Sequence, residues 1–197
     1  LAELVLLYKE KQEYEAALKT ANQLMKENRQ QALLSDMDSH IRDLEALTLD
    51  VNQRISELES KYQKAGEVKT VTGRALALSL SELYLSVNET EKAVSILNQL
   101  LDNIDKESEE VEVVSNAYYL LAKWHSDTGD FRKGASLYLD SAGLFILYDL
   151  DLAARAMYRG AESFSACGMQ MDAKSVVNQM FDLFPDNEWT QAASKWR

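Results

Sequence analysis

Few side chains in this sequence have the types that catalysis or metal binding usually requires. The two histidines, His40 and His125, lie far apart, and neither belongs to a paired zinc-ligand motif. His125 replaces an aromatic residue in a recurring helical pattern, so we expect it to be packed in a helix, and we expect His40 to face solvent. Cys167 is the only cysteine. It lacks the basic neighbour or helix N-terminus that activates a thiolate, so we expect a structural role.

Acidic residues that lie close together in the sequence have structural explanations. Asp149 and Asp151 are placed to cap a helix after Tyr148. The acidic run over residues 102–112 lacks the central glycine of a calcium loop and predicts a solvated inter-helix loop. A Gly-rich nucleotide loop and a Gly-x-Ser-x-Gly elbow are both absent from the sequence. The sequence therefore predicts no catalytic residue, no cofactor and no metal ion.

The excess of acidic residues disfavours partners that are themselves negatively charged. The formal net charge is −11, and residues 67–113 contribute −6 of it, with 4 basic and 10 acidic groups. Such a surface repels phosphate, so we expect neither nucleic acid nor an anionic membrane as a partner. No apolar run is long enough for direct membrane insertion. The compartment stays open between cytoplasm and periplasm, and the start at Leu1 suggests a processed or trimmed chain.

The composition favours long helices. The chain has 1 Pro and 7 Gly among 197 residues, whereas strand-rich folds need many turns. Strong helix formers are plentiful, and apolar residues recur at spacings of three and four. We therefore predict an all-α fold.

One pattern of apolar, aromatic, turn and small residues recurs four times. The first copy comprises Leu4, Val5, Tyr8, Gln12, Tyr14, Ala17, Ala21 and Leu24. The second comprises Leu80, Ser81, Tyr84, Asn88, Thr90, Ala93, Leu97 and Leu100. The third comprises Leu121, Ala122, His125, Gly129, Asp130, Phe131, Gly134, Tyr138 and Ser141. The fourth comprises Gly160, Ala161, Phe164, Gly168, Gln170, Ala173, Val177, Met180 and Pro185.

The later copies each predict two amphipathic helices around a tight turn. Positive φ is expected at the turn residues, which are Asn88, Gly129 and Gly168. Close approach of the second helix to the first is expected at the small residues, which are Ala93, Gly134 and Ala173. Pro185 should block continuation of the last of these helices.

This pattern resembles the tetratricopeptide repeat over roughly residues 1–27 and 75–185. Copies lie about 40 residues apart here, compared with ~34 in the family, so the helices or loops are longer. The resemblance implies a right-handed α-solenoid of antiparallel helix pairs. It also implies a concave groove lined by the first helix of each pair. The outward positions of those helices that we carry over as partner-binding residues are Asn116, Tyr119, Lys123, Arg155, Tyr158 and Glu162.

Residues 30–66 depart from the repeat and predict one long helix with a heptad seam. The seam comprises Leu34, Met37, Ile41, Leu44, Thr48, Val51, Ile55, Leu58, Tyr62 and Ala65. Two alternatives are open: the helix packs back on the rest of the chain, or it forms a homodimer through the seam. The predicted organisation is a first helix pair (1–29), the long helix (30–66), three pairs (67–185) and a C-terminal capping helix (186–197).

We interpret the chain as a non-catalytic scaffold that binds a peptide or helix of a protein partner in the groove. One alternative is a structural subunit of a bacterial envelope or secretion assembly that uses the long helix and the convex surface. The bacterial source is suggested only by the tail, which is similar to the ends of many bacterial tetratricopeptide proteins. Another alternative is an interaction domain trimmed from a larger regulator.

Overall fold

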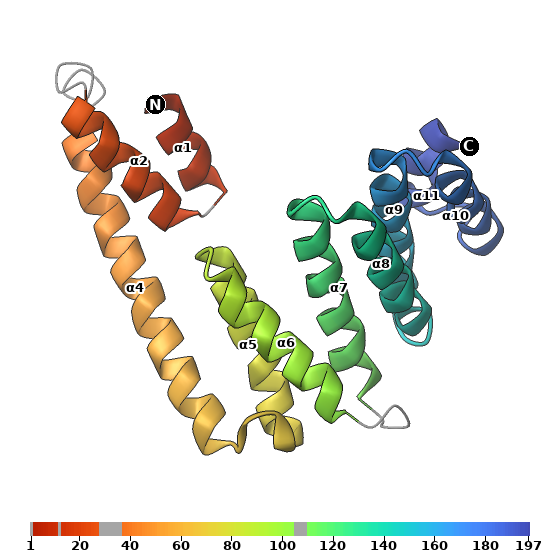
Figure 1. Ribbon diagram of the computed structural model, residues 1–197, viewed down its shortest axis with the longest axis horizontal. Helices are drawn as coiled ribbons and strands as arrows, with labels where there is room; N and C mark the ends of the chain where they lie inside the picture. Colours follow the sequence, from red (N-terminus) through yellow and green to blue (C-terminus); the bar gives the residue numbers. More distant parts are fainter. Residues whose placement is uncertain (1, 12, 28–36, 105–109) are drawn as a thin grey trace. The chain divides into compact units, whose positions relative to one another are not determined.

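The computed structural model describes the chain except for residues 1, 12, 28–36 and 105–109. The described part consists of α-helices and two short 3-10 helices, η1 and η2, without a strand, so the predicted all-α class is confirmed. Two compact units, Leu1–Ile96 and Leu97–Arg197, make up the chain and are described separately (Figure 1). No helix in the described ranges combines the length and the apolar character needed to cross a membrane.

In its described residues, the N-terminal part of unit 1 contains α1 (Ala2–Glu10), α2 (Tyr14–Glu27) and α4 (Met37–Lys64). α2 packs against both α1 and α4 (Figure 1). Their apolar faces meet in a buried core of Val5, Ala17, Ala21, Leu24, Met37 and Leu44. This burial follows from the repeat pattern, since the first copy supplies four of these residues at helical spacing.

The remainder of unit 1 places α5 (Val71–Ser86) against α4. The chain leaves α4 at Gly66, whose φ of 88° lies in the left-handed region, and passes through η1 (Glu67–Lys69). The Thr70 hydroxyl then caps α5 by accepting a hydrogen bond from the Gly73 amide at 3.0 Å. This turn connects α4 to the second repeat.

The predicted long helix is present as α4, which has 28 residues. Its buried seam members are Met37, Leu44, Val51, Ile55 and Tyr62. Because α2 and α5 of the same chain pack on α4, this burial supports the alternative in which the helix packs back. The other alternative, a homodimer through residues 30–66, concerns the oligomeric state, which the structure of a single chain does not test. Leu34, the first seam residue, lies outside the described residues.

α6 (Thr90–Asn103) follows α5 after a turn and crosses the boundary between the units. Asn88 has the positive φ predicted for this turn, 62°. Beyond the turn, the Lys92 Nζ lies 5.0 Å from the centroid of the buried Tyr84 ring. The Tyr84 hydroxyl also donates a hydrogen bond to Glu59 of α4, so the second repeat is connected to the long helix.

Unit 2 contains the third and fourth repeats and the tail. Consecutive helices from α7 to α10 pack against one another, and α11 packs against α9 and α10 (Figure 1). The elements are α7 (Val111–Asp127), α8 (Phe131–Phe145), α9 (Leu150–Ala166), α10 (Gln170–Leu183), α11 (Glu188–Ala193) and η2 (Ser194–Trp196). As predicted, Pro185 comes just after α10, two residues beyond its last residue, Leu183.

The predicted turns, and the close approach predicted at Gly134, are present in unit 2. Gly129 and Gly168 have φ values of 89° and 80°, which L side chains rarely adopt. Gly134 of α8 lies directly against α7, because a Cβ atom there would overlap the Ser126 hydroxyl and lie 3.0 Å from the Ala122 carbonyl oxygen. The glycine therefore allows the two helix backbones to meet.

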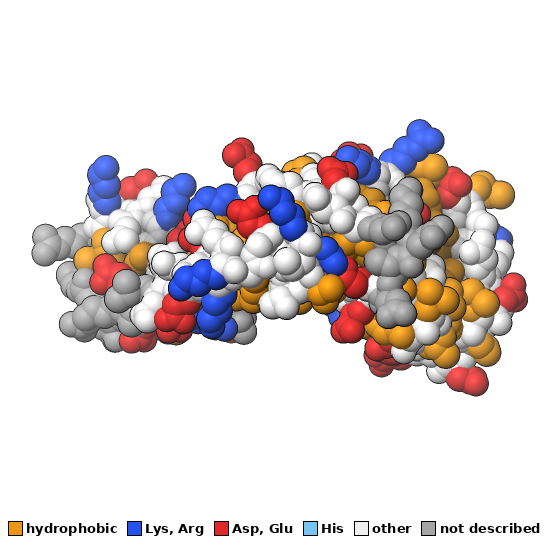
Figure 2. Space-filling view, turned by 90° about the horizontal axis from the view of Figure 1, so that it is seen from below, with side chains coloured by type: hydrophobic (Ala, Val, Ile, Leu, Met, Phe, Trp, Pro, Cys, Tyr) orange, Lys and Arg blue, Asp and Glu red, His pale blue; other side chains and the backbone are white. Residues whose placement is uncertain are grey.

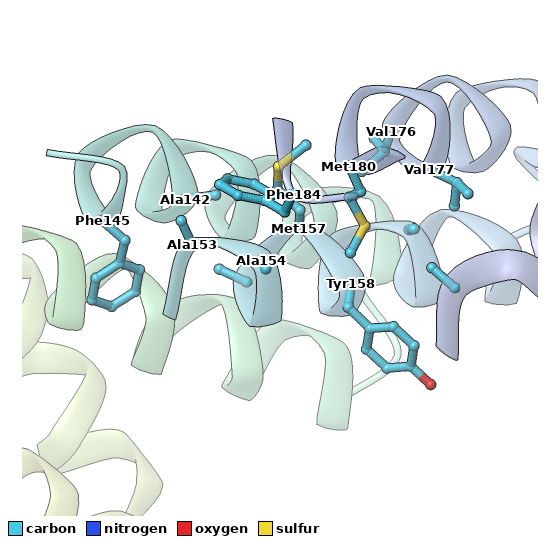
Figure 3. Packing of buried hydrophobic residues seen from close by; sticks show 13 residues of the cluster. Ala142, Phe145, Ala153, Ala154, Met157, Tyr158, Val176, Val177, Met180 and Phe184 are labelled. Carbon is cyan, nitrogen blue, oxygen red and sulfur yellow. The ribbon is translucent and has the colours of Figure 1, made fainter. Parts of the chain in front are cut away.

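The core of unit 2 is centred on α9. Its buried residues include Ala142, Phe145, Ala153, Ala154, Met157, Val176, Val177, Met180 and Phe184 (Figure 3). Small alanines on α9 leave room for the larger side chains of α8 and α10, which is how cores reach high packing density. The first helices of the last two repeats are held in place by this core.

Candidate peptide-binding face

The helices predicted to line a groove, α7 and α9, contact each other directly in unit 2. The Ser126 and Ser163 hydroxyl oxygens lie 2.9 Å apart. About two turns away on each helix, the Cζ atom of Arg155 lies 5.4 Å from the centroid of the Tyr119 ring. We call Tyr119, Lys123 and Arg155, with their immediate neighbours, the α7–α9 face.

Arg155 is positioned by the N-terminus of α9. The Asp149 carboxylate caps this helix by accepting hydrogen bonds from the amides of Asp151 and Leu152, both at 3.0 Å. The predicted capping role of this acidic pair is therefore confirmed for Asp149. The cap fixes where α9 begins. It therefore also fixes the position of Arg155 on the surface of this helix.

Tyr119 is held by an aromatic cluster. Its ring centroid lies 5.2 Å from that of Tyr138 and 6.3 Å from that of Phe145, both in edge-to-face arrangements. The side chain is half-buried, so one part of the ring packs on the core and the remainder lies at the surface beside Arg155. A guanidinium next to an aromatic ring gains cation–π attraction while its donors stay available.

Tyr158 differs from the prediction, which took it to be an exposed aromatic of the groove. The side chain is buried, with 9% of its surface accessible. Trp189 and Trp196 of the tail cover it, each with a ring centroid 5.3 Å from that of Tyr158. Figure 3 shows its hydroxyl pointing away from the other labelled core residues. Tyr158 therefore belongs to the surface of α9 on which the tail packs.

The tail is attached to α9 by polar as well as aromatic contacts. The Lys195 ammonium donates to the Tyr158 hydroxyl at 3.2 Å. The Asn187 amide group donates to Asp151 at 2.9 Å, and its carbonyl oxygen caps α11 by accepting from the Trp189 amide. Of Asp186 and Asn187, two residue types that both commonly cap helices, it is Asn187 that caps α11. The tail therefore closes one side of the α7–α9 face.

The other predicted site residues have different surroundings. Lys123 is exposed on α7. Asn116 is half-buried, and its side-chain amide donates to the backbone carbonyl of Glu112 at 2.8 Å, within its own helix. Glu162 pairs with Arg159 one turn away, at 2.6 Å. The structure thus brings Tyr119 and Arg155 together, and it gives Asn116 and Glu162 partners within their own helices.

Sequence reasoning missed the tail as a contributor to this face. The indole of Trp189 lies 5.9 Å from the Cζ atom of Arg155, so Arg155 lies beside two aromatic rings from different helices. The spacing of Trp189 and Trp196, seven residues apart in the tail, is the signal that could have indicated two rings on one side. Arg159 was also missed, although its Cζ lies 5.7 Å from the Tyr158 ring.

The two histidines and the cysteine have different surroundings. His125 is buried as predicted, and its Nδ1 lies 3.4 Å from a carboxylate oxygen of Asp130. His40 is half-buried, not solvent-facing as expected, and its Nδ1 is shielded without a hydrogen-bond partner in the described part of the chain. Cys167 follows α9 at its C-terminal end and is exposed. Among the described residues, no cluster of three or more potential metal ligands occurs.

Unit 1 contains a groove that the sequence did not indicate. It is a groove of about 700 Å³ along α4 and α5, closed at one side by Tyr14 of α2. Its apolar lining residues are Leu47, Val51, Leu58, Leu83 and Val87, and its polar lining residues are Asp50, Arg54, Glu57, Lys61, Ser79, Glu82 and Ser86. Burial raises the pKa of Glu82. Charges of both signs line this groove, so it favours no single class of ligand.

A scan against protein-family models, a search of curated proteins and a search of solved structures each find no match to this chain. The resemblance to the tetratricopeptide repeat therefore stays an interpretation of the residue pattern.

Proposed function

We propose that this chain is a tetratricopeptide-like α-solenoid scaffold that binds a peptide or helix of a protein partner on the α7–α9 face. The observation that carries the proposal is the contact of Arg155 with Tyr119, which joins the first helices of two successive repeats. In such scaffolds, neighbouring first helices together form one binding surface. The proposal includes no catalytic step.

The chemistry of the α7–α9 face favours a particular kind of peptide. Arg155 and Lys123 are exposed cations in a chain whose net charge is −11, and they lie on adjacent helices. The half-buried Tyr119 ring between their helices offers an aromatic surface. A peptide that carries a carboxylate next to an apolar side chain can pair with the cations and pack on the ring.

The covered position of Tyr158 limits the extent of this surface. The tail rings lie over Tyr158, so a peptide would lie along α7 and the exposed side of α9 and meet the tail at Trp189. Arg155 contacts both Tyr119 of α7 and Trp189 of the tail. It therefore lies where the α7–α9 face meets the tail. We expect Arg155 to contribute more to binding than any other residue of this face.

Hydrogen exchange on the captured complex tests the proposal. The full chain is used to isolate a partner from its native cells, and amide exchange is compared with and without the purified partner. We expect slower exchange in α7 and α9, with α8 and α10 as internal controls. Protection confined to α8 and α10, or to unit 1, would contradict binding on the α7–α9 face.

A further inference from the structure

Unit 2 exposes a cluster of large apolar side chains at the connection between α8 and α9. Ile146, Leu147, Tyr148 and Leu150 are 39%, 68%, 43% and 58% exposed, respectively. We call these four residues the α8–α9 patch. Figure 2 shows orange side chains gathered on this part of unit 2, with red carboxylates at their border. Contiguous exposed apolar residues with a polar rim are typical of interaction surfaces.

The patch has a fixed position in the fold. The Tyr148 hydroxyl lies 2.5 Å from the Ser115 hydroxyl of α7, and the Tyr148 ring centroid lies 5.6 Å from that of Phe145 in the core. Ser141 of α8 donates a hydrogen bond to the Ser115 carbonyl oxygen at 2.8 Å. The apolar residues therefore project from a connection that is held to α7 and to the core.

Several helices bring carboxylates to this end of unit 2. Glu112 lies about one turn before Ser115 on α7, whose hydroxyl contacts the Tyr148 hydroxyl, and Asp149 directly follows Tyr148 in the chain. Burial raises the pKa of Tyr148, the bond with Ser115 lowers it, and the negative charges of Glu112 and Asp149 raise it further. Asp151 follows Leu150, and its bond from Asn187 connects the link between α10 and α11 to the same end.

Basic residues are missing from the segments that meet here. Residues 110–116, 140–154 and 180–189 contain no Lys or Arg. They contain eight carboxylates: Glu110, Glu112, Asp140, Asp149, Asp151, Asp182, Asp186 and Glu188. The opposite ends of the same helices carry both positive and negative charges. Examples are the basic residues Lys133 and Arg159 and the acidic residues Asp127 and Glu162. Within the described residues, these three segments therefore bring only negative charge to the end of unit 2 that carries the apolar patch.

We propose that the α8–α9 patch docks a basic amphipathic segment of another protein, with apolar side chains on the patch and Lys or Arg side chains on the surrounding carboxylates. The reason is complementarity, because charges around an interface select partners of opposite sign. Two other occupants fit poorly. An anionic membrane is repelled by the carboxylates, and a second copy of this chain would place the same acidic border against itself.

This docking surface goes beyond the proposed peptide-binding face. It uses the connection between α8 and α9 instead of the outward side of α7 and α9, and it selects a basic segment, whereas Arg155 and Lys123 favour a carboxylate. Either site can therefore fail without the other.

The test uses the full chain and a synthetic peptide in which Leu recurs at helical spacing and Lys fills the other positions. Calorimetry gives the affinity of this peptide for the wild type, for Leu147→Ser/Leu150→Ser and for Met171→Ser. Met171 is a matched control, since it is 80% exposed at the start of α10. We expect roughly tenfold or greater weakening in the double variant, an unchanged affinity in the control, and weaker binding by Glu112→Gln.

A second peptide, with Glu in place of every Lys, tests the charge requirement and should bind at least about tenfold more weakly. The thermal midpoint of each variant checks folding, and all the replaced side chains are exposed. Equal affinity of the double variant and the wild type for the Lys peptide overturns the proposal, as does equal affinity of the two peptides. Two other results also overturn the proposal. One is self-association of the wild type that the double variant abolishes, and the other is binding to anionic vesicles through Leu147 and Leu150.

Discussion

The Arg155 guanidinium lies between two aromatic rings, 5.4 Å from the Tyr119 centroid on α7 and 5.9 Å from the Trp189 centroid on α11. One side chain of α9 thus connects the first helix of the preceding repeat to the tail. In this arrangement, loss of Arg155 should change binding more than folding, because the side chain is exposed and its ring contacts are individually weak.

Tyr158 should matter for stability. We expect Tyr158→Ala to lower the free energy of unfolding by roughly 3 kcal/mol, because it removes a buried ring that packs against Trp189 and Trp196. Tyr158→Phe keeps the ring and loses only the hydroxyl that accepts from Lys195, so it should cost at most about 1 kcal/mol. Urea unfolding measures both changes, and equal stability of the two variants would show that the tail does not cover this ring.

Two glycines of α8 should respond in opposite ways to the same substitution. Gly134→Ala places a methyl group against Ser126 and the Ala122 carbonyl oxygen, so we expect a loss of ~1–3 kcal/mol. Gly143→Ala meets nothing within 4 Å and should stabilise the helix by ~0.5–1 kcal/mol. Urea unfolding of both variants measures the difference. If Gly134→Ala were as stable as Gly143→Ala, the close approach of α8 to α7 would be wrong.

His125 should titrate below the usual range for histidine. Burial lowers the pKa of the imidazole, Lys133 lowers it further, and Asp130 partly opposes both. The unfolded chain then binds a proton at His125 more tightly than the folded chain does. Neutral His125 therefore stabilises the folded chain fully above about pH 6.5, and this stabilisation is lost as the pH falls through the pKa of the folded chain. NMR titration of the ring should give a pKa below about 6.5, and a lower one still in Asp130→Asn. A pKa at or above the ordinary value would contradict this packing.

The long helix gives a prediction about oligomeric state. Leu44, Val51 and Ile55 of its seam are buried within the chain. We therefore expect a monomer in sedimentation velocity over the micromolar range, because a dimer through the seam would first have to displace α2 or α5. A dimer that Ile55→Asp disrupts while the helix content stays intact would instead favour self-association through residues 30–66.

Local features of the fold were accessible from the sequence because they depend on a few neighbouring residues. Asn88, Gly129 and Gly168 have the positive φ that their place after a helical run predicts. Asp149 caps α9, and Gly134 allows close helix contact, as residue type and spacing indicate. These features follow from steric and hydrogen-bonding rules that act within one or two turns.

Features that depend on contacts between distant segments were not accessible in the same way. Tyr158 occupies a position that should be outward-facing in its helix, and only the folding of Trp189 and Trp196 back onto α9 buries it. His40 similarly lies on the predicted polar side of its helix, yet it is half-buried. A heptad seam specifies that a helix has an apolar side but leaves open which partner covers it.

Affinity capture of the full chain from its native cells tests binding on the α7–α9 face through a comparison of two charge-reversal variants. One variant is Lys123→Glu/Arg155→Glu on the first helices, and the other is Arg132→Glu/Lys174→Glu on the exposed surface of the second helices. Each pair changes the net charge equally, and thermal unfolding confirms that both fold. We expect a partner captured by the wild type to be lost only with Lys123→Glu/Arg155→Glu. Retention of every partner by that variant, or equal loss from both, would contradict binding on the α7–α9 face.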